Sequence, residues 1–187
     1  MRIIGGKFRG TRLTDIAQGD AVAHLRPTSD RVRESVFNLL VNGGYGDPLA
    51  GARVLDLFAG TGALGLEALS RGAAHILFVE TGEKSRAIIR KNIDLIRAIG
   101  PTKLFRRDAT ALGPVTGKPF DLVFLDPPYG NCLGPKALDA AARGGWLAPK
   151  ALIVWEENSA QDPPSGFALL DARRYGDTWI TILRYDS

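Results

Sequence analysis

Asp126-Pro127-Pro128-Tyr129 is a segment whose residue types point to chemistry on an amine. It directly follows the apolar run 120–125, which we expect to form a strand. Two successive prolines remove two backbone donors and keep the chain extended, so the carbonyl of Pro127 can face outward as an acceptor beside the Asp126 carboxylate. Two acceptors can orient an exocyclic base amine toward a methyl carbon, while the Tyr129 ring stacks on the base. The alternative interpretation is a strand that ends in a rigid turn.

A second candidate segment has the pattern G-x-G-x-x-G at Gly60, Gly62 and Gly65, between an expected strand at 53–58 and an expected helix at 63–71. Glycines in this place permit a tight turn and let a ligand approach the backbone. The pattern serves NAD, FAD and S-adenosylmethionine alike, and a simple helix-capping turn would need no ligand.

Asp56 narrows the choice of ligand. A carboxylate at this end of the strand would repel a pyrophosphate, whereas the methionine part of S-adenosylmethionine carries a cationic ammonium and a cationic sulfonium. Glu80 ends the next expected strand and can accept hydrogen bonds from both ribose hydroxyls, as it could in an NAD site. Asp108 could accept a bond from the adenine amino group or could only cap the turn at 109–112. The predicted cofactor-binding residues are Asp56, Phe58, Gly60, Gly62, Glu80 and Asp108.

Alternating strands and helices are expected to position these segments. The predicted strands are 53–58, 75–80, 102–107, 120–126 and 151–157, and the predicted helices are 63–71, 83–99 and 135–143. Residues 167–175 and 178–185 alternate apolar and polar side chains around Gly176-Asp177, which predicts a hairpin. The result is an α/β fold with a seven-stranded, mostly parallel sheet and an antiparallel C-terminal hairpin. A dinucleotide-binding fold would continue to a sixth parallel strand instead.

The chain before residue 47 is expected to form a small N-terminal extension, residues 1–46, on a main domain of residues 47–187. Residues 2–13 could form a hairpin, and Thr28 or Ser29 could cap a helix that runs to Val41 and packs its apolar stripe on the body. The first 33 residues hold seven basic and three acidic side chains, a net charge of +4, while the remaining 154 residues balance at zero. An excess of basic residues in the first 33 positions suits binding to a phosphate-rich partner. The alternative is a charged face that is only solvated. The residues predicted to contact a nucleic acid are Arg2, Lys7, Arg9, Arg12, Arg26, Arg31 and Arg33.

Composition limits the remaining classes of protein. A chain of 187 residues with 45% apolar and 24% charged residues is long enough to bury a core without disulfides or metal. Cys132 is the single cysteine, and the first residues lack the apolar region of a secretory leader, so we expect a cytoplasmic protein. His24 and His75 lack metal-ligand spacing with any partner, and no metal site is predicted.

The sequence resembles the class I methyltransferases that use S-adenosylmethionine, and among them the RsmD family, bacterial enzymes that methylate the N2 amine of a guanine in 16S ribosomal RNA. The resemblance covers nearly the whole chain, in the blocks 2–6, 9–10, 25–28, 30–34, 37–38, 60–71 and 126–129. The N-terminal blocks distinguish this family from DNA adenine methyltransferases, which share only the glycine loop and the tetrapeptide. The family often has Phe at the position of Tyr129, so the resemblance supports stacking by the ring and not a role for the hydroxyl.

The resemblance implies a Rossmann-like fold, S-adenosylmethionine in a pocket lined by the predicted cofactor residues, and a target guanine held by residues 126–129. It also implies that the basic N-terminal segment contacts 16S rRNA within small ribosomal subunits, with ribosomal proteins nearby. Other functions stay open at this point. A DNA or RNA adenine-N6 methyltransferase would use the same loop and tetrapeptide, a protein-glutamine methyltransferase would typically have Asn in place of Asp126, and a non-catalytic RNA-binding assembly factor could keep the fold.

Overall fold

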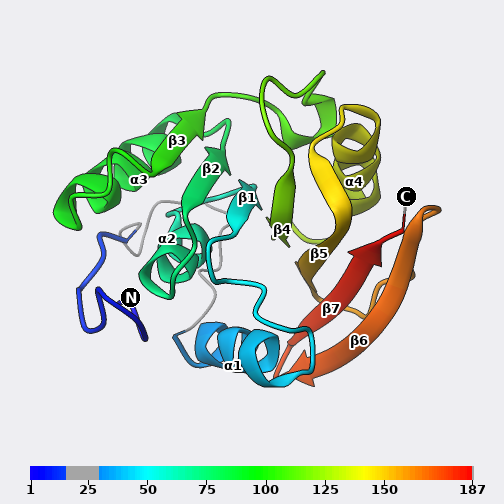
Figure 1. Ribbon diagram of the computed structural model, residues 1–187, viewed down its shortest axis with the longest axis horizontal. Coiled ribbons are helices and arrows are strands. Elements are labelled where there is room, and N and C mark those ends of the chain that lie inside the picture. Colours follow the sequence, from blue (N-terminus) through cyan, green and yellow to red (C-terminus); the bar gives the residue numbers. More distant parts are fainter. Residues whose placement is uncertain (16–29, 187) are drawn as a thin grey trace.

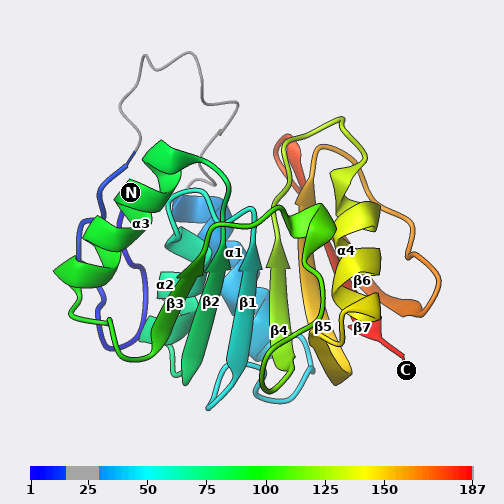
Figure 2. The same cartoon turned by 90° about the horizontal axis from the view of Figure 1, so that it is seen from above.

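The computed structural model describes residues 1–15 and 30–186 and has a single twisted sheet covered by helices on both faces (Figures 1 and 2). The strands are β1 (Arg53–Leu57), β2 (His75–Val79), β3 (Thr102–Phe105), β4 (Phe120–Leu125), β5 (Leu147–Glu157), β6 (Phe167–Tyr175) and β7 (Thr178–Tyr185). The helices are α1 (Asp30–Asn42), α2 (Ala63–Ser70), α3 (Glu83–Leu95), α4 (Leu133–Arg143) and the 3-10 helix η1 (Ala109–Ala111).

The strand order is β3-β2-β1-β4-β5-β7-β6. The first five strands are parallel, and β7 pairs antiparallel with both β5 and β6. This confirms the predicted seven-stranded sheet with its antiparallel C-terminal hairpin. The chain winds outward in one direction from β1 to β3 and in the other from β4, so the order reverses between β1 and β4. In open parallel sheets, ligands bind outside the carboxyl ends of the strands at this point of reversal.

The central strands are apolar on both faces because helices cover both sides of the sheet. Along β1 and β4, Val54 and Phe124 belong to the core beneath α1, α2 and α3. Leu55 and Val123 point the other way, into the core beneath α4 and η1. The alternation of side chains along each strand therefore builds two separate cores.

The N-terminal extension shares the first of these cores. Phe37 of α1 is fully buried with its ring centroid 5.6 Å from that of Phe124, so the predicted apolar stripe does pack on the body. Ile3 and Leu13 are buried in the same core. The segment 1–15 folds back on itself as the predicted small hairpin, with an antiparallel bridge between Arg2 and Arg12 and a hydrogen bond from the N–H of Ile3 to the carbonyl of Thr11 at 3.0 Å. The predicted caps Thr28 and Ser29 lie outside the described residues.

Two elements differ from their predicted ranges by four residues at one end, whereas the other predicted elements differ by at most two. The strand β5 begins at Leu147, four residues before the predicted start, because an irregularity with Lys150 at φ 63° allows residues on both sides of it to pair with β4. The helix α3 ends at Leu95 instead of continuing to Ile99, and Arg97 has a left-handed φ of 54°. None of the helices in the described part of the chain is long and apolar enough to cross a membrane.

Candidate active site

The two predicted reactive segments lie side by side at one edge of the sheet. β1 and β4 are parallel neighbours with Leu57 opposite Leu125, so the glycine loop and the Asp126 segment leave the sheet at the same level. The backbone N–H of Asp126 donates to the carbonyl of Leu57 at 3.5 Å. Figure 2 shows both strands with their carboxyl ends at the same edge. The geometry therefore places the expected cofactor loop next to the expected substrate turn.

The glycine loop needs its glycines for two different reasons. Gly60 and Gly62 have φ values of 55° and 78°, in the left-handed region that favours glycine. Gly65 lies within α2, where a Cβ would come within 2.5 Å of the Phe78 ring and 3.0 Å of an Asp56 carboxylate oxygen. The third glycine thus lets α2 pack closely on the sheet. Phe58, just before the loop, has a φ of 58°, a strained value for a bulky residue.

Asp56 is 1% exposed and lies behind the loop. Its carboxylate accepts a hydrogen bond from the N–H of Gly65 at 3.0 Å, which ties β1 to the first turn of α2. Burial raises the pKa of Asp56 to about 8; the Gly65 hydrogen bond opposes this shift and the charge of Glu80 adds to it. The observed contact of Asp56 is therefore with the loop backbone, and a direct contact with a cofactor stays a prediction.

Glu80 follows β2 and joins two loops. One carboxylate oxygen accepts from the N–H of Gly60 at 2.9 Å, and the other accepts from the N–H of Gly82 at 2.6 Å. Each oxygen keeps a further lone pair, and the side chain is only partly buried. Glu80 is thus held rigidly and can still accept hydrogen bonds from hydroxyl groups of a ligand.

Asp108 caps η1, which confirms the predicted cap of the turn at 109–112. One carboxylate oxygen accepts from the backbone N–H and from the hydroxyl of Thr110, both at 2.8 Å. The residue is exposed at the same edge of the sheet as Glu80, because it follows β3. Contact with an adenine amino group stays a prediction.

The backbone carbonyls of the Asp126 segment differ in their hydrogen bonding. The carbonyls of Pro128 and Tyr129 accept from the Asn131 side-chain amide at 3.4 and 3.3 Å. The Pro127 carbonyl accepts no hydrogen bond from any residue in the described ranges, although Pro127 is buried. This agrees with a carbonyl that is available to a ligand.

Tyr129 is anchored by a residue that the sequence analysis missed. Its hydroxyl donates to a carboxylate oxygen of Glu156 at 3.1 Å, and Glu156 is 4% exposed near the end of β5. Burial and the charge of Glu156 raise the pKa of Tyr129, which therefore stays protonated. Two consecutive carboxylates that end an apolar strand, Glu156 and Glu157, were the available signal, because β5 is the neighbour of β4.

The residues around the loop suit a cationic ligand better than a pyrophosphate. Asp56 and Glu80 are close enough for the charge of one to raise the pKa of the other. Asp126 lies near Tyr129 and raises the pKa of that residue in the same way. The carboxylates of Glu80 and Asp126 thus lie near the glycine loop, where a diphosphate would meet repulsion and an ammonium or sulfonium would meet attraction. The buried Asp56, with its raised pKa, adds little charge there at neutral pH. The glycine backbone and the Glu80 acceptors fit S-adenosylmethionine.

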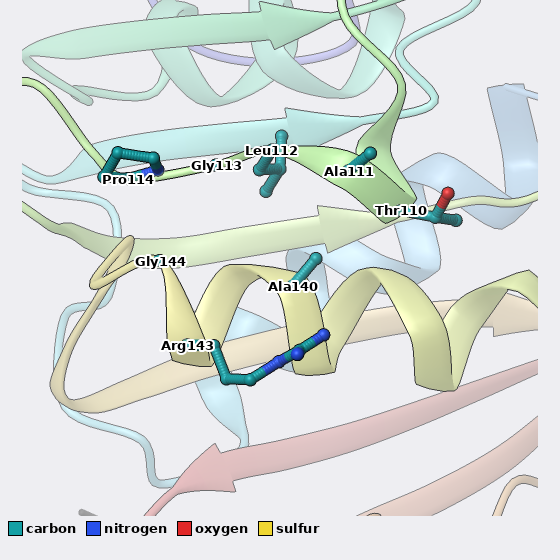
Figure 3. Close-up of a pocket in the computed structure, with 8 residues that line it drawn as sticks. All are labelled: Thr110, Ala111, Leu112, Gly113, Pro114, Ala140, Arg143 and Gly144. Carbon is teal, nitrogen blue, oxygen red and sulfur yellow. The ribbon is translucent and has the colours of Figure 1, made fainter.

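A cavity of about 350 Å³ lies beside this site but is separate from it (Figure 3). One wall is the segment 110–114, and the other is the C-terminal half of α4 with Ala140, Arg143 and Gly144. None of the predicted cofactor or catalytic residues lines it.

The predicted RNA-contacting residues have different environments. Arg2, Lys7, Arg9, Arg12 and Arg31 are exposed. Arg33 is fully buried, and the prediction of an RNA contact is wrong for this residue. Its guanidinium donates to the backbone carbonyl of Arg2, pairs with Asp30 at 2.8 Å and lies 3.9 Å from Glu67. Arg26 lies outside the described residues.

Two further observations concern the remaining site predictions. Within the described ranges, no group of three or more His, Cys, Asp or Glu side chains is arranged to hold a metal ion. Cys132 is exposed and lies directly before α4.

Comparison with known proteins places this geometry in a family. Residues 1–184 match the family described as "Conserved hypothetical protein 95". Ribosomal RNA small subunit methyltransferase D of Escherichia coli K12 is 38% identical over 172 residues, which cover 90% of this chain and 82% of that protein. The chain belongs to the RsmD family. Ribosomal RNA small subunit methyltransferase D of Haemophilus influenzae is 33% identical over 182 residues, which cover 94% of this chain and 89% of that protein.

Solved structures show the same fold. The structure of yhhF from Escherichia coli superposes with a TM-score of 0.83 at 32% identity, covering all of this chain and 98% of that one. HI0767 from Haemophilus influenzae gives a TM-score of 0.79 at 28% identity with the same coverage. The RsmD fold thus extends over the whole chain, N-terminal segment included.

Proposed function

We propose that this RsmD-family protein transfers a methyl group from S-adenosylmethionine to the exocyclic N2 amine of a guanine in 16S rRNA. The observation that carries the proposal is the adjacency of the glycine loop and the Asp126 segment at the carboxyl edge of β1 and β4. The relatives that are named as small-subunit rRNA methyltransferases support this choice of substrate.

The residues of the loop would hold the cofactor. S-adenosylmethionine supplies an electrophilic methyl group when it is bound. Gly60 and Gly62 would leave the backbone open to it, Glu80 would offer acceptors for its ribose hydroxyls, and Asp108, exposed at the same edge, would accept from its adenine amino group. Asp56 fixes the loop from behind, and Phe58 adds an apolar wall at the end of β1.

The Asp126 segment would hold the amine. The Asp126 carboxylate and the Pro127 carbonyl accept its two hydrogens, which aims the nitrogen lone pair away from the ring plane and toward the methyl donor. The Tyr129 ring stacks on the guanine, and Glu156 fixes that ring through the hydroxyl. Pro128 keeps the turn rigid, and the proton that the amine loses passes to Asp126 or to water.

The basic N-terminal segment would contact the phosphate backbone of 16S rRNA within the small subunit. Arg2, Lys7, Arg9, Arg12 and Arg31 are exposed for this purpose. Such a substrate would place the enzyme in the cytoplasm, where the subunits are assembled. We keep the division into an extension of residues 1–46 and a domain of residues 47–187 as part of this proposal.

The direct test uses small subunits purified from a strain that lacks this gene. Labelled methyl from S-adenosylmethionine is transferred by the purified protein, the rRNA is digested to nucleosides, and the labelled position is mapped. We expect one labelled nucleoside, N2-methylguanosine, in 16S rRNA. Labelled N6-methyladenosine, or cofactor binding without any transfer, would overturn the proposal.

A further inference from the structure

A strongly basic stretch of the sequence lies outside the N-terminal segment and has no part in the proposed site. Residues 83–107 contain eight basic and two acidic side chains, so this stretch has a net charge of +6, more than the +4 of the whole chain. The basic residues are Lys84, Arg86, Arg90, Lys91, Arg97, Lys103, Arg106 and Arg107. They lie on α3, on the edge strand β3 and in the loops that follow these elements.

Most of this charge faces solvent. Arg86 is buried and donates to the backbone carbonyl of Thr81, so it supports the β2–α3 turn. The other seven side chains are exposed. On α3, Ile89 and Ile93 are buried in the core, and the adjacent Arg90 and Lys91 point outward.

Three exposed basic residues, Arg90 and Lys91 on α3 and Arg97 in the loop after it, form no ion pair in the described part of the chain. Three arginines toward the opposite end of the sheet are paired instead. The pairs there are Arg143 with Asp139, Arg173 with Asp171, and Arg184 with Asp186. The positive field is therefore concentrated at the α3 end of the molecule.

The outer face of α3 is continuous with the N-terminal segment. Thr14 and Asn92 exchange two hydrogen bonds, at 2.7 and 3.1 Å, which bind the segment to α3. Figures 1 and 2 show the blue N-terminal trace near α3. Arg12 and Lys91 flank this contact in the sequence and are both exposed. At the other end, Arg106 follows β3 at the same edge as Glu80, whose N–H donates to the Phe105 carbonyl at 3.1 Å. Basic side chains thus extend from the candidate active site, along α3, to the N-terminal segment.

We infer that the outer face of α3 with Arg90 and Lys91, together with Arg97 in the loop that follows it, is a second phosphate-binding surface that holds the RNA backbone beside the reacting nucleotide. The inference rests on the proposed function for the identity of its partner, RNA. Cationic side chains that replace condensed counterions bind phosphates regardless of base sequence, so this surface positions the substrate and does not choose the guanine. The RNA leaves the active site toward α3 and away from β6 and β7.

The test compares two triple variants that lose the same number of charges. The test variant is Arg90→Gln, Lys91→Gln and Arg97→Gln, and the control is Arg143→Gln, Arg173→Gln and Arg184→Gln. Binding to a 16S rRNA transcript is measured as a function of salt concentration. We expect the test variant to bind about tenfold more weakly near 0.15 M salt, with a log–log salt slope shallower by about 2 to 3. The control should stay within about twofold of wild type, because its residues are paired at the far end.

Binding is measured without catalysis, so the two proposals can fail separately. A test variant with the wild-type affinity and salt slope overturns the α3 surface, whether or not the enzyme transfers methyl groups. A difference in slope between the two variants supports the surface even if the wild-type protein methylates no small subunit, a result that would defeat only the proposed function. Methyl transfer at saturating RNA should be unchanged in the test variant, and a loss of kcat with unaltered affinity would also overturn the inference.

Discussion

Asp56 is an acid that the folded chain keeps from ionising. Because burial raises its pKa to about 8, the folded protein holds one more proton at this site than the unfolded chain, whose aspartates titrate near 3.9, over the pH range between these two values. The side chain is therefore largely protonated at neutral pH and stabilises the loop as a neutral hydrogen-bonding group.

Replacing Asp56 with Asn tests this protonation. As pH rises from about 4 to about 8, the wild type should lose stability from this site by up to about 1.4 kcal/mol per pH unit, because the folded state must release its extra proton. Asn keeps an acceptor for the Gly65 N–H and has no proton to lose, so the variant should gain stability relative to wild type with rising pH. Urea unfolding at pH 5 and at pH 8 measures the difference. A stability difference that does not change with pH would show that Asp56 is ionised in the fold.

Tyr129 combines a ring that we expect to stack with a hydroxyl that is hydrogen-bonded to Glu156. Tyr129→Phe keeps the ring and loses only this bond, so kcat should fall less than about tenfold, in keeping with a loss of about 1 kcal/mol. Tyr129→Ala removes the stacking surface and should lower methyl transfer by more than about a hundredfold. Steady-state kinetics with small subunits compares the two variants. Equal activity of the Ala and Phe variants would exclude stacking on the base.

The helix α2 holds the N-terminal segment through the buried carboxylate of Glu67. The two oxygens of Glu67 accept from the N–H groups of Ile4 and Gly5 at 2.7 and 2.8 Å. The same carboxylate pairs with Arg71 at 2.7 Å and faces the buried guanidinium of Arg33. Lys7 donates its N–H to the carbonyl of Ser70, so the segment follows α2 to its last residue. Arg9 and Lys7 are therefore about one length of α2, roughly 12 Å, from the glycine loop.

Glu67→Gln should break this attachment. The Gln amide would place an N–H₂ group against a backbone N–H donor, and the buried guanidinium of Arg33 would lose the negative charge that compensates it. We therefore expect the free energy of unfolding to fall by about 3 kcal/mol. Hydrogen exchange at the Ile4 and Gly5 amides should accelerate in parallel. The matched control is Asp139→Asn, which breaks the exposed pair with Arg143 and should cost less than about 1 kcal/mol. Unaltered protection of Ile4 and Gly5 in the Gln variant would mean that another contact holds the segment.

The strands were predictable where their sequences contain a short run of mostly apolar residues. β1, β2 and β4 lie within about one residue of their expected ranges because four or more of their residues in succession are buried. The early start of β5 and the early end of α3 depend on left-handed residues, Lys150 and Arg97, which are not glycines. Side-chain pattern alone does not reveal such backbone conformations.

Contacts between distant segments explain what the sequence did not predict in the site. The spacing of the glycines and of the Asp126 segment relative to their strands was enough to predict their adjacency, because parallel strands end at the same edge. Arg33 was assigned to RNA from its charge, but the tertiary fold buries it against Glu67. Glu156 was missed because its link to Tyr129 depends on the side-by-side position of β5 and β4.

Across the whole protein, the folded chain gathers basic residues that are distant in the sequence. The 154 residues after Arg33 balance at zero, yet residues 83–107 hold +6 and are compensated by acidic residues elsewhere. Folding brings this stretch beside the N-terminal segment through Thr14 and Asn92. Exposed basic side chains of both segments therefore lie toward one end of the molecule, while Arg143, Arg173 and Arg184 toward the other end are paired.

The proposed methyl transfer requires the Asp126 turn to hold the amine beside the cofactor loop without binding the cofactor itself. The decisive measurement is single-turnover methyl transfer to small subunits by Asp126→Ala, with calorimetry of S-adenosylmethionine binding on the same preparation. We predict a rate at least about a thousandfold below that of wild type, because an acceptor that positions the amine is lost, and a Kd for the cofactor within about threefold of the wild-type value. A variant that transfers methyl at a rate near that of wild type would contradict the account.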